Sequence, residues 1–338
     1  MTLVYPRRNN HIRDEFFSYY SVKTNFKIKK IWAPDFYFPG QLDKIAVNIK
    51  GLISALLLFF YTLTQKADII YSRDEWPLYF LSFFRKNLVF EAHRFSKHRK
   101  FFYKRFKNKN LKIIAISIGL KEDLVKFGIK DSNILVAHDG VDLDDFDIRV
   151  SKEEARNKTG LPRDAKIIMY TGHLFPWKGA DILGEAAKLL SEIKFIFVGG
   201  MDTDTKSFKN KFGQVKNILV LGHKPHKEIA ILLKAADVLV LPNSAKEKIS
   251  AYTSPLKLFE YMASSRPVVA SDLLAIREIL NNQNSVLVTP DNPEELARGI
   301  ELILGKSDTG ETLAKKAFED VKNYTWQSRV KKILEFIS

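Results

Sequence analysis

Cysteine is absent from this chain of 338 residues, and acidic residues are too few to balance the basic ones. Without cysteine the protein forms no disulfide, thiolate metal site or cysteine nucleophile, a composition that agrees with a reducing cytoplasm. The longest apolar run, from Gly51 to Thr64, is shorter than the roughly 18–20 residues that span a bilayer. We therefore interpret it as a buried core helix. No segment has the pattern of a signal peptide.

Hydrophobic residues make up 46% of the chain, which is enough to build two buried cores. A length of 338 residues suits two domains of ordinary size, and no low-complexity segment indicates a disordered tail. The composition therefore favours a soluble two-domain enzyme.

The positive charge is concentrated in the first half. Residues 1–150 contain 26 Lys/Arg against 16 Asp/Glu, a net charge of +10, and the remainder has a net charge of +5. Between Arg94 and Lys112 the 19 residues include nine basic side chains and no acidic one. Aromatic residues are interleaved with them (Phe95, Phe101, Phe102, Tyr103 and Phe106).

This mixture of basic and aromatic side chains favours docking to an anionic membrane surface, with rings entering the interface. Two other interpretations remain open. One is a solvated basic loop that covers core aromatics, and the other is nucleic-acid binding. We favour the membrane, with no nucleic-acid partner, and place Arg99, Lys100, Lys104 and Arg105 on the membrane or acceptor side.

Short apolar strands alternate with helical patterns through the second half of the chain, which indicates a parallel sheet covered on both faces. The predicted strands are Lys166–Gly172, Lys194–Gly200, Asn217–Gly222, Val238–Asn243, Pro267–Ser271 and Ser285–Pro290. The predicted helices are Gly179–Leu190, His226–Ala236, Pro255–Ser264, Ala275–Leu280 and Pro293–Leu304.

The first half has the same character, although its pattern is less regular. Its predicted strands are Leu3–Tyr5, Ala67–Ser72, Asn87–Glu91, Lys112–Ser117 and Asn133–Ala137. The stretch from Val141 to Gly160 lacks an apolar strand, so we place the domain boundary there. We predict an α/β protein with two Rossmann-like domains facing across a cleft, residues 1–150 and 151–325.

A candidate anion site begins at Ser254, which we interpret as an N-cap, with Pro255 as the first helical residue. The next amides, of Leu256 and Lys257, are unpaired at the positive end of the helix dipole. Glu260 follows one turn later and offers a carboxylate to a sugar diol. This combination suits a sugar linked to a phosphate, although a Ser-Pro cap on a core-facing helix explains the same residues without a ligand.

Two further elements lie at predicted strand ends. After the strand ending at Gly172, the segment continues through His173 to Lys178, whose ammonium group would lie beside a helix start and could stabilise a departing diphosphate. The segment has neither the dinucleotide-binding glycine pattern nor that of a P-loop. The other element is the strand end at His93, and an isolated histidine in such a place is more often structural than catalytic.

Assembled, these segments resemble the family-4 retaining glycosyltransferases of GT-B fold, the group 1 glycosyltransferases. The resemblance is carried by three segments in the family's order and spacing, which are Tyr170–Gly179, His138–Asp142 and Ser254–Glu260 continuing to Ser271. It is strongest from about Val136 to Leu280 and weakest before Ala67.

The resemblance implies a role for each candidate residue. Residues 151–325 would bind a nucleotide-sugar, and residues 1–150 would form the acceptor side. Lys178 would contact the phosphates, Glu260 the ribose, and the Leu256 and Lys257 amides the diphosphate. His93 would face the donor sugar. The helix over residues 326–338 would cross back to the N-terminal domain.

Three positions depart from the family. His173 stands where an arginine usually follows the glycine of the phosphate loop. Tyr252 replaces the first glutamate of a pair, eight residues before Glu260. No N-terminal glycine-rich loop is evident, and Pro6–His11 occupies its place. There Arg7 and Arg8 could attract an anionic acceptor, or could belong to a flexible surface turn.

We therefore expect a retaining glycosyltransferase that moves a sugar from a nucleotide-sugar to a glycan or lipid-linked acceptor, in cell-surface polysaccharide or glycolipid biosynthesis. It would work at the inner face of the cytoplasmic membrane without a cofactor or metal. The segment Asp202–Asp204 has the Asp-x-Asp form of a metal site but is interpreted as a surface turn. The alternatives are a nucleotide-sugar 2-epimerase or hydrolase of the same fold, and a non-catalytic basic protein that binds membrane or nucleic acid.

Overall fold

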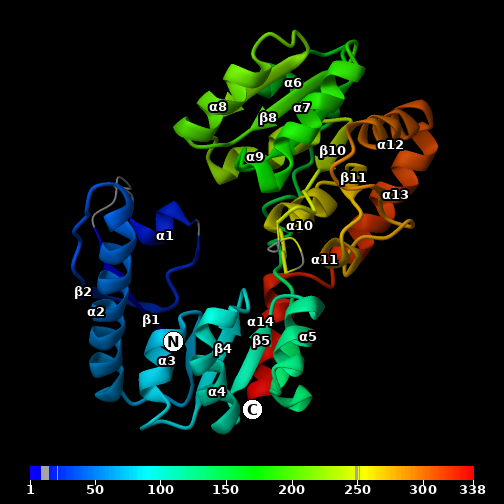
Figure 1. Ribbon diagram of the computed structural model, residues 1–338. Helices are drawn as coiled ribbons and strands as arrows, with labels where there is room; N and C mark the ends of the chain where they lie inside the picture. The colour runs from blue at the N-terminus through cyan, green and yellow to red at the C-terminus, as the bar shows by residue number, and fades with distance from the viewer. Residues whose placement is uncertain (9–14, 21, 248–249, 251) are drawn as a thin grey trace. The chain divides into compact units, whose positions relative to one another are not determined.

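The computed structural model describes residues 1–8, 15–20, 22–247, 250 and 252–338 (Figure 1). Residues 9–11, part of the segment that replaces the glycine-rich loop, lie outside this description. The chain divides into two compact units. One comprises Met1–Ile114 with Val125–Ile134, and the other comprises Ala115–Leu124 with Leu135–Ser338. The domain boundaries expected at residues 150 and 325 stay predictions.

The first half of the chain is α/β, as predicted. Its elements are β1 (Thr2–Arg7), α1 (Phe16–Tyr19), β2 (Lys27–Trp32), η1 (Gly40–Leu42), α2 (Asp43–Leu63), β3 (Ile70–Ser72), α3 (Glu75–Leu81), β4 (Leu88–Ala92), η2 (Lys97–Arg99), α4 (Lys100–Asn108), β5 (Lys112–Ala115), α5 (Ile118–Lys126), η3 (Asp131–Asn133) and β6 (Ile134–Val136). The strands form a parallel pair, β1-β2, and a four-stranded sheet in the order β3-β4-β5-β6.

Helix α2 corrects the interpretation of Gly51–Thr64 as a buried core helix. It begins eight residues earlier, at Asp43, and is 21 residues long with a mean hydropathy of 1.8 over its most apolar stretch. Only 28% of that stretch is buried. By length and composition alone, α2 could cross a bilayer, and it is the single helix with this property in the described part of the chain.

The second unit contains a six-stranded sheet in the order β12-β11-β10-β7-β8-β9, and its assigned pairs are parallel. Its elements are α6 (Lys152–Thr159), β7 (Ile167–Thr171), η4 (Pro176–Lys178), α7 (Ala180–Leu189), β8 (Lys194–Val198), α8 (Asp202–Phe212), β9 (Ile218–Gly222), α9 (His226–Ala235), β10 (Val238–Leu241), α10 (Leu256–Ala263), β11 (Val268–Ser271), α11 (Leu274–Arg277), β12 (Val286–Val288), α12 (Pro293–Gly305), α13 (Ser307–Val321) and α14 (Trp326–Ile337).

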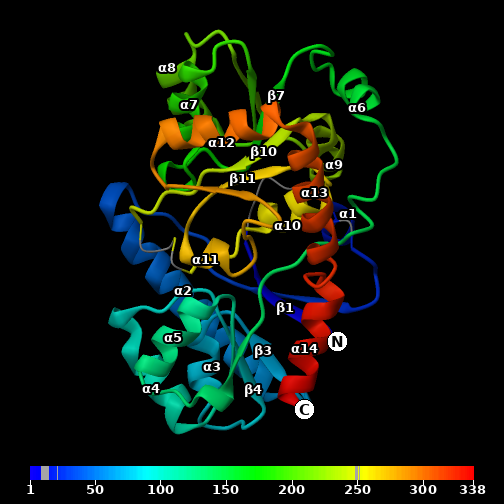
Figure 2. The ribbon, with the colours of Figure 1, turned by 90° about the vertical axis from the view of Figure 1, so that its right-hand side faces the viewer.

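The central strands β7, β10 and β11 are buried at every position, so both faces of the sheet are covered there. Along β7, Ile167 and Met169 belong to one core cluster, whereas Ile168 and Tyr170 belong to the other. Helices α9, α10 and α13 contribute to the first cluster, and α7, α8 and α12 to the second. Figure 2 shows α12 lying over β10 and β11.

The strand order reverses direction between β7 and β10. From β7 the chain moves outward through β8 and β9, and then returns to the other side of β7 with β10, β11 and β12. In open parallel sheets, ligands bind beyond the carboxyl ends of the strands at such a switch point. The loops after β7 and β10 therefore occupy the position where a ligand is expected.

A buried carboxylate attaches residues 115–124 to the second unit. Glu278 accepts hydrogen bonds from the backbone N–H of Ile118, at 2.8 Å, and of Gly119, at 3.4 Å, and lies 2.6 Å from His138 Nε2. It thus satisfies donors at the start of α5, where anionic groups are favoured.

Candidate functional site

A cavity of about 420 Å³ lies at the switch point of the second unit. It is lined by the loop after β7, including the predicted Gly172, His173 and Lys178, and by the start of α10. The loop can turn here because Gly172 has φ +122° and Gly179 has φ +76°, both in the left-handed region. A Cβ on Gly179 would lie 1.7 Å from the Pro242 carbonyl oxygen, so the β7 and β10 loops approach closely only with glycine.

The start of α10 contributes five predicted residues to the same cavity: Ser254, Pro255, Leu256, Lys257 and Glu260. The capping prediction was wrong in detail. The helix begins at Leu256 with extended Pro255 at its N-cap, and the Ser254 hydroxyl instead accepts a hydrogen bond from the Asp139 N–H at 3.0 Å. The first bond of the helix is donated by Leu258 to the Pro255 carbonyl, so the Leu256 and Lys257 amides precede it.

Lys257 has a role that the sequence analysis missed, because we considered only its amide. Its side chain is 8% exposed, and its ammonium group has no hydrogen-bond partner among the described residues. The ammonium lies 3.7 Å from the centre of the Tyr170 ring. Burial lowers the pKa of Lys257 well below its ordinary value, and the neighbouring Lys178 lowers it further.

Lys178 is a second ammonium group in this cavity. Burial lowers its pKa to about 8, and the group lies 4.0 Å from the centre of the Trp177 ring. Two partly desolvated cations of the same sign oppose each other's ionisation unless an anion joins them. The cavity therefore has the charge of a site for a polyanion such as a diphosphate.

Glu260 is held by a histidine that we did not predict. His226 Nε2 lies 3.2 Å from Glu260 Oε1, and this hydrogen bond raises the pKa of His226. His223 and Lys224 line the cavity as well. All three follow β9 in a polar loop and helix start. In the sequence these residues are marked only by following a predicted strand. Ordinary surface residues also follow strands, so the pattern does not identify them.

The two departures His173 and Tyr252 have partners of their own. The His173 ring stacks on Phe175 at 4.9 Å, and His173 Nδ1 lies 3.8 Å from Asp204. The Tyr252 hydroxyl donates a hydrogen bond to Asp123, and Tyr252 does not line the cavity. Replacing the expected glutamate by tyrosine thus removes a carboxylate and links the loop before α10 to α5.

The Asp-x-Asp segment is not a turn. Asp202 and Asp204 lie in the first turn of α8, where Asp204 accepts hydrogen bonds from the backbone N–H groups of Met201 and, at 2.9 Å, Leu174. Carboxylates are stabilised at a helix start. Asp204 thereby fixes the loop that carries His173. The described residues contain no group of three or more His, Cys, Asp or Glu side chains arranged to hold a metal ion.

His93 belongs to the first unit, where both of its ring nitrogens are engaged. Nε2 lies 2.6 Å from Glu91 Oε1, and Nδ1 lies 3.2 Å from a guanidinium nitrogen of Arg73. Because a guanidinium group has no acceptor, Nδ1 must accept and Nε2 must donate to Glu91. These two contacts orient the His93 ring, and its contact with a donor sugar stays a prediction.

The basic segment is only partly a free surface. Phe102, Tyr103 and Phe106 are buried core residues, which corrects the expectation that the interleaved rings are available to a membrane. Arg99 pairs with Glu75 at 2.8 Å, and Arg105 donates hydrogen bonds to Ser82, through Nε to the hydroxyl at 2.8 Å and through the guanidinium to the carbonyl at 3.0 Å. Exposed positions are occupied by Lys100, Lys104, Arg7 and Arg8, whereas the side chain of Lys97 lies outside the description.

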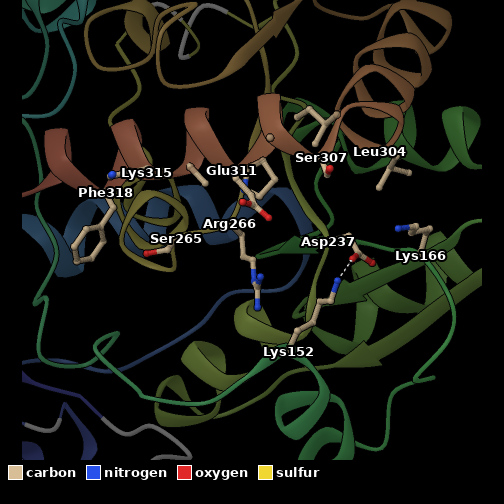
Figure 3. A pocket seen from close by; sticks show the side chains of 14 residues that line it. Lys152, Lys166, Asp237, Ser265, Arg266, Leu304, Ser307, Glu311, Lys315 and Phe318 are labelled. Atoms are coloured by element: carbon tan, nitrogen blue, oxygen red, sulfur yellow. Dashed lines mark hydrogen bonds and ion pairs between the residues drawn. The ribbon is translucent and has the colours of Figure 1, made fainter.

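A second cavity, of about 370 Å³, lies at the opposite ends of the strands (Figure 3). There Asp237, just before β10, accepts hydrogen bonds from Lys152 at 2.7 Å, Arg156 at 2.6 Å and the Ile167 N–H at 2.7 Å. Burial opposes ionisation of this carboxyl, but these bonds hold its pKa below the ordinary value. The network joins α6 to the sheet, and we assign it a structural role.

Comparison with known proteins gives a concordant result. The model for "Glycosyl transferases group 1" matches residues 151–320. A putative teichuronic acid biosynthesis glycosyltransferase of Bacillus subtilis is 30% identical over 190 residues, covering 56% of this chain and 45% of that protein. The matches span about half the length of the curated relatives.

Among solved structures, a Rickettsia africae glycosyltransferase has a TM-score of 0.74 at 22% identity, covering 92% of this chain and 84% of that one. Anabaena HepE, solved with UDP and glucose, has a TM-score of 0.73 at 19% identity, covering 92% and 85%. These likenesses show the α/β GT-B fold. Because the family model matches half of its length, the chain belongs to the group 1 glycosyltransferases.

Proposed function

We propose that this protein transfers a sugar from a nucleotide-sugar to a glycan or lipid-linked acceptor, with retention at the anomeric carbon. The observation that carries the proposal is the pair of partly desolvated ammonium groups, Lys178 and Lys257, beside the Leu256 and Lys257 amides that precede the first hydrogen bond of α10. Together they suit the diphosphate of a nucleotide-sugar, which must leave as the glycosidic bond breaks.

The second group in the cavity suits the nucleoside. Glu260 lies one turn beyond the helix start, and its carboxylate can accept hydrogen bonds from a ribose diol. His226 limits the orientations that this carboxylate adopts. The relatives whose printed names describe UDP complexes have the same fold, which supports a nucleoside diphosphate as the leaving group here.

The cavity lining favours a mechanism without a covalent enzyme intermediate. Among its lining residues Glu260 is the one carboxylate, and it pairs with His226. Charge developing on the departing diphosphate is met by Lys178, Lys257 and the α10 amides. An acceptor hydroxyl entering on the face that the leaving group vacates gives retention. We also propose that the reaction needs no metal ion, because the two ammonium groups supply positive charge at the leaving group.

The test begins with incubation of the full chain with a panel of nucleotide-sugars, with and without a lipid or glycan extract. Nucleoside diphosphate release that depends on the extract supports transfer, and chelation of divalent ions should leave the rate unchanged. Release into water alone would favour the hydrolase, rearrangement without an acceptor would favour the epimerase, and absence of turnover would favour a non-catalytic protein.

The matched variant is Lys178→Ala. This variant should turn over more slowly, because it loses a charge-assisted contact to the leaving group. The expected loss of transition-state stabilisation is about 2–4 kcal/mol. Lys188→Ala is the control, since Lys188 pairs at the surface with Glu185 on α7. Steady-state rates measure the effect, and a folded Lys178→Ala protein with near-normal turnover contradicts the assigned role.

A further inference from the structure

Helix α2 (Figure 1) carries several exposed apolar side chains on the surface of the first unit. Ile45, Ile49, Leu52 and Phe60 are 51%, 41%, 38% and 61% exposed. These positions are spaced by four, three and eight residues, so they share one face of the helix. Soluble helices normally turn a polar face to water, and a helix that is apolar on its exposed side indicates an apolar environment there.

The stripe continues into exposed aromatic rings at the C-terminal end of α2. Phe59 contacts Phe60 at 5.1 Å between ring centres and Phe84 at 5.6 Å. Beyond them, Tyr79 contacts both Phe83 and Phe101 at 5.5 Å. We call the seven exposed members of this surface the α2–α4 face: Ile45, Ile49, Leu52, Phe60, Phe83, Phe84 and Phe101.

Basic side chains accompany the aromatic end of this face. The Arg105 guanidinium lies 3.8 Å from the centre of the Phe83 ring. Arg85 and Lys86 follow Phe84 directly, and Lys100 and Lys104 lie beside Phe101 on α4. The buried acid of this region, Glu75, is paired with Arg99. Phenylalanine rings beside the exposed Lys86, Lys100 and Lys104 suit the headgroup region of an anionic bilayer.

The other side of α2 belongs to the folded unit, so the helix lies along a surface rather than crossing a membrane. Ala46, Lys50 and Ser54 are buried. The Lys50 ammonium lies 3.6 Å from the centre of the Tyr37 ring. At the end of the helix, Arg85 donates hydrogen bonds to the carbonyls of Leu63 and Gln65, both at 2.9 Å. A spanning helix would lose these contacts.

From these observations we propose that the α2–α4 face binds the surface of an anionic lipid bilayer, with the α2 stripe entering the interface and the lysines meeting headgroups. A second copy of the chain is the weaker occupant, because pairing two such faces would bring basic segments of like charge together. The proposal goes beyond sugar transfer and does not rest on the donor chemistry.

The experiment is flotation of the full chain with two kinds of vesicle, pure phosphatidylcholine and phosphatidylcholine mixed with phosphatidylglycerol. The protein should float with the anionic vesicles, and binding should weaken with salt, because exposed charges are screened beyond about 8–10 Å at physiological ionic strength. Equal recovery with both vesicles, or loss of anionic-vesicle binding on adding RNA, overturns the proposal.

Paired variants separate the two parts of the face. Leu52→Ser with Phe60→Ser should reduce affinity for anionic vesicles by roughly tenfold or more, because two apolar side chains no longer enter the interface. Lys100→Glu with Lys104→Glu should remove the preference for anionic lipid. Leu302→Ser is the control, since Leu302 is an exposed leucine on α12 of the second unit.

Circular dichroism establishes that each variant is folded, and sedimentation without vesicles tests for a second copy. A dimer that the Leu52→Ser, Phe60→Ser protein dissociates would assign the face to self-association and overturn the membrane proposal. Unchanged flotation of that folded variant would overturn it as well. Because no nucleotide-sugar is present, these outcomes are independent of whether the protein transfers sugar.

Discussion

At the scale of single residues, the cavity at the switch point contains two lysines whose pKa is lowered by burial, Lys178 and Lys257. Within the part of the chain that the structure describes, neither lysine has a carboxylate at hydrogen-bonding distance, and Glu260 pairs with His226. Such a combination is costly in a folded protein unless a ligand uses it. The cost of these buried lysines is therefore best explained by the proposed binding of a diphosphate.

The Glu260–His226 pair gives a prediction with two readouts. In Glu260→Gln the pKa of His226 should fall, because the amide oxygen can still accept the hydrogen bond but lacks the negative charge that favours the imidazolium. Nucleoside diphosphate affinity should fall by about 1–2 kcal/mol, since an amide accepts ribose hydroxyl groups less well than a carboxylate. Proton NMR of the imidazole and calorimetry measure the two effects.

The sign of the stability effect follows from the raised pKa of His226. The pair stabilises the folded state fully below the ordinary histidine pKa of 6.5, and this contribution is lost as the pH rises through the folded value. Glu260→Gln should abolish that pH dependence. Glu301→Gln, an exposed site on α12, is the control. Unchanged affinity in Glu260→Gln would assign Glu260 a structural role.

At the scale of elements, the loops that follow β7 and β10 pack closely against each other at a glycine, Gly179. Gly179 lies between η4 and α7 with φ +76°, and the Pro242 carbonyl after β10 occupies the space where a Cβ would lie. The close approach sets the position of Lys178, which immediately precedes this glycine. The geometry of the cation therefore depends on backbone packing.

Gly179→Ala should destabilise the protein by about 2–4 kcal/mol and reduce turnover, because the methyl group overlaps backbone and the residue has a left-handed conformation. The matched control is Gly51→Ala in α2, where a Cβ meets no atom within 4 Å. That change should be neutral or stabilising by up to about 1 kcal/mol, since alanine favours a helix. Denaturant unfolding of both proteins tests the pair, and equal effects would contradict the packing argument.

At the scale of the whole molecule, ligand binding and stability are linked, because the cavity at the switch point exists only in the folded chain. A nucleoside diphosphate at a hundredfold excess over its dissociation constant would stabilise the protein by about 2.7 kcal/mol. UDP, GDP and ADP are the probes, and the one that raises Tm most identifies the base. No shift with any of them would argue against a nucleotide site.

The variant Lys257→Met should reduce this ligand-induced shift while raising the Tm of the unliganded protein. The buried ammonium costs free energy without a partner, and methionine fills similar space without charge. The lowered pKa of Lys257 in the wild-type protein provides a second test, which is the dependence of stability on pH. The unliganded wild type should gain stability as the pH rises from the folded pKa of Lys257 toward 10.5, and the variant should lack that part of the gain.

The α/β class, the parallel sheet of the second half and most of its strands could be predicted from sequence, because strands buried on both faces are apolar at every position. The residues of the β7 loop and α10 start could be predicted too, since glycine, proline and a following lysine or glutamate report local backbone needs. Such local signals also place Gly172 at a strand end, and Lys178 and Glu260 near helix starts.

Only the tertiary structure decided which surfaces are buried and which side chains meet. In the folded chain Phe102 and Phe106 are buried, whereas the α2 stripe is exposed. The N-cap of α10 is Pro255 rather than Ser254. Glu260 contacts His226, and Tyr252 contacts Asp123. These outcomes depend on contacts between segments far apart in the chain. Composition and spacing describe a segment's own preference, whereas burial and pairing depend on its neighbours in space.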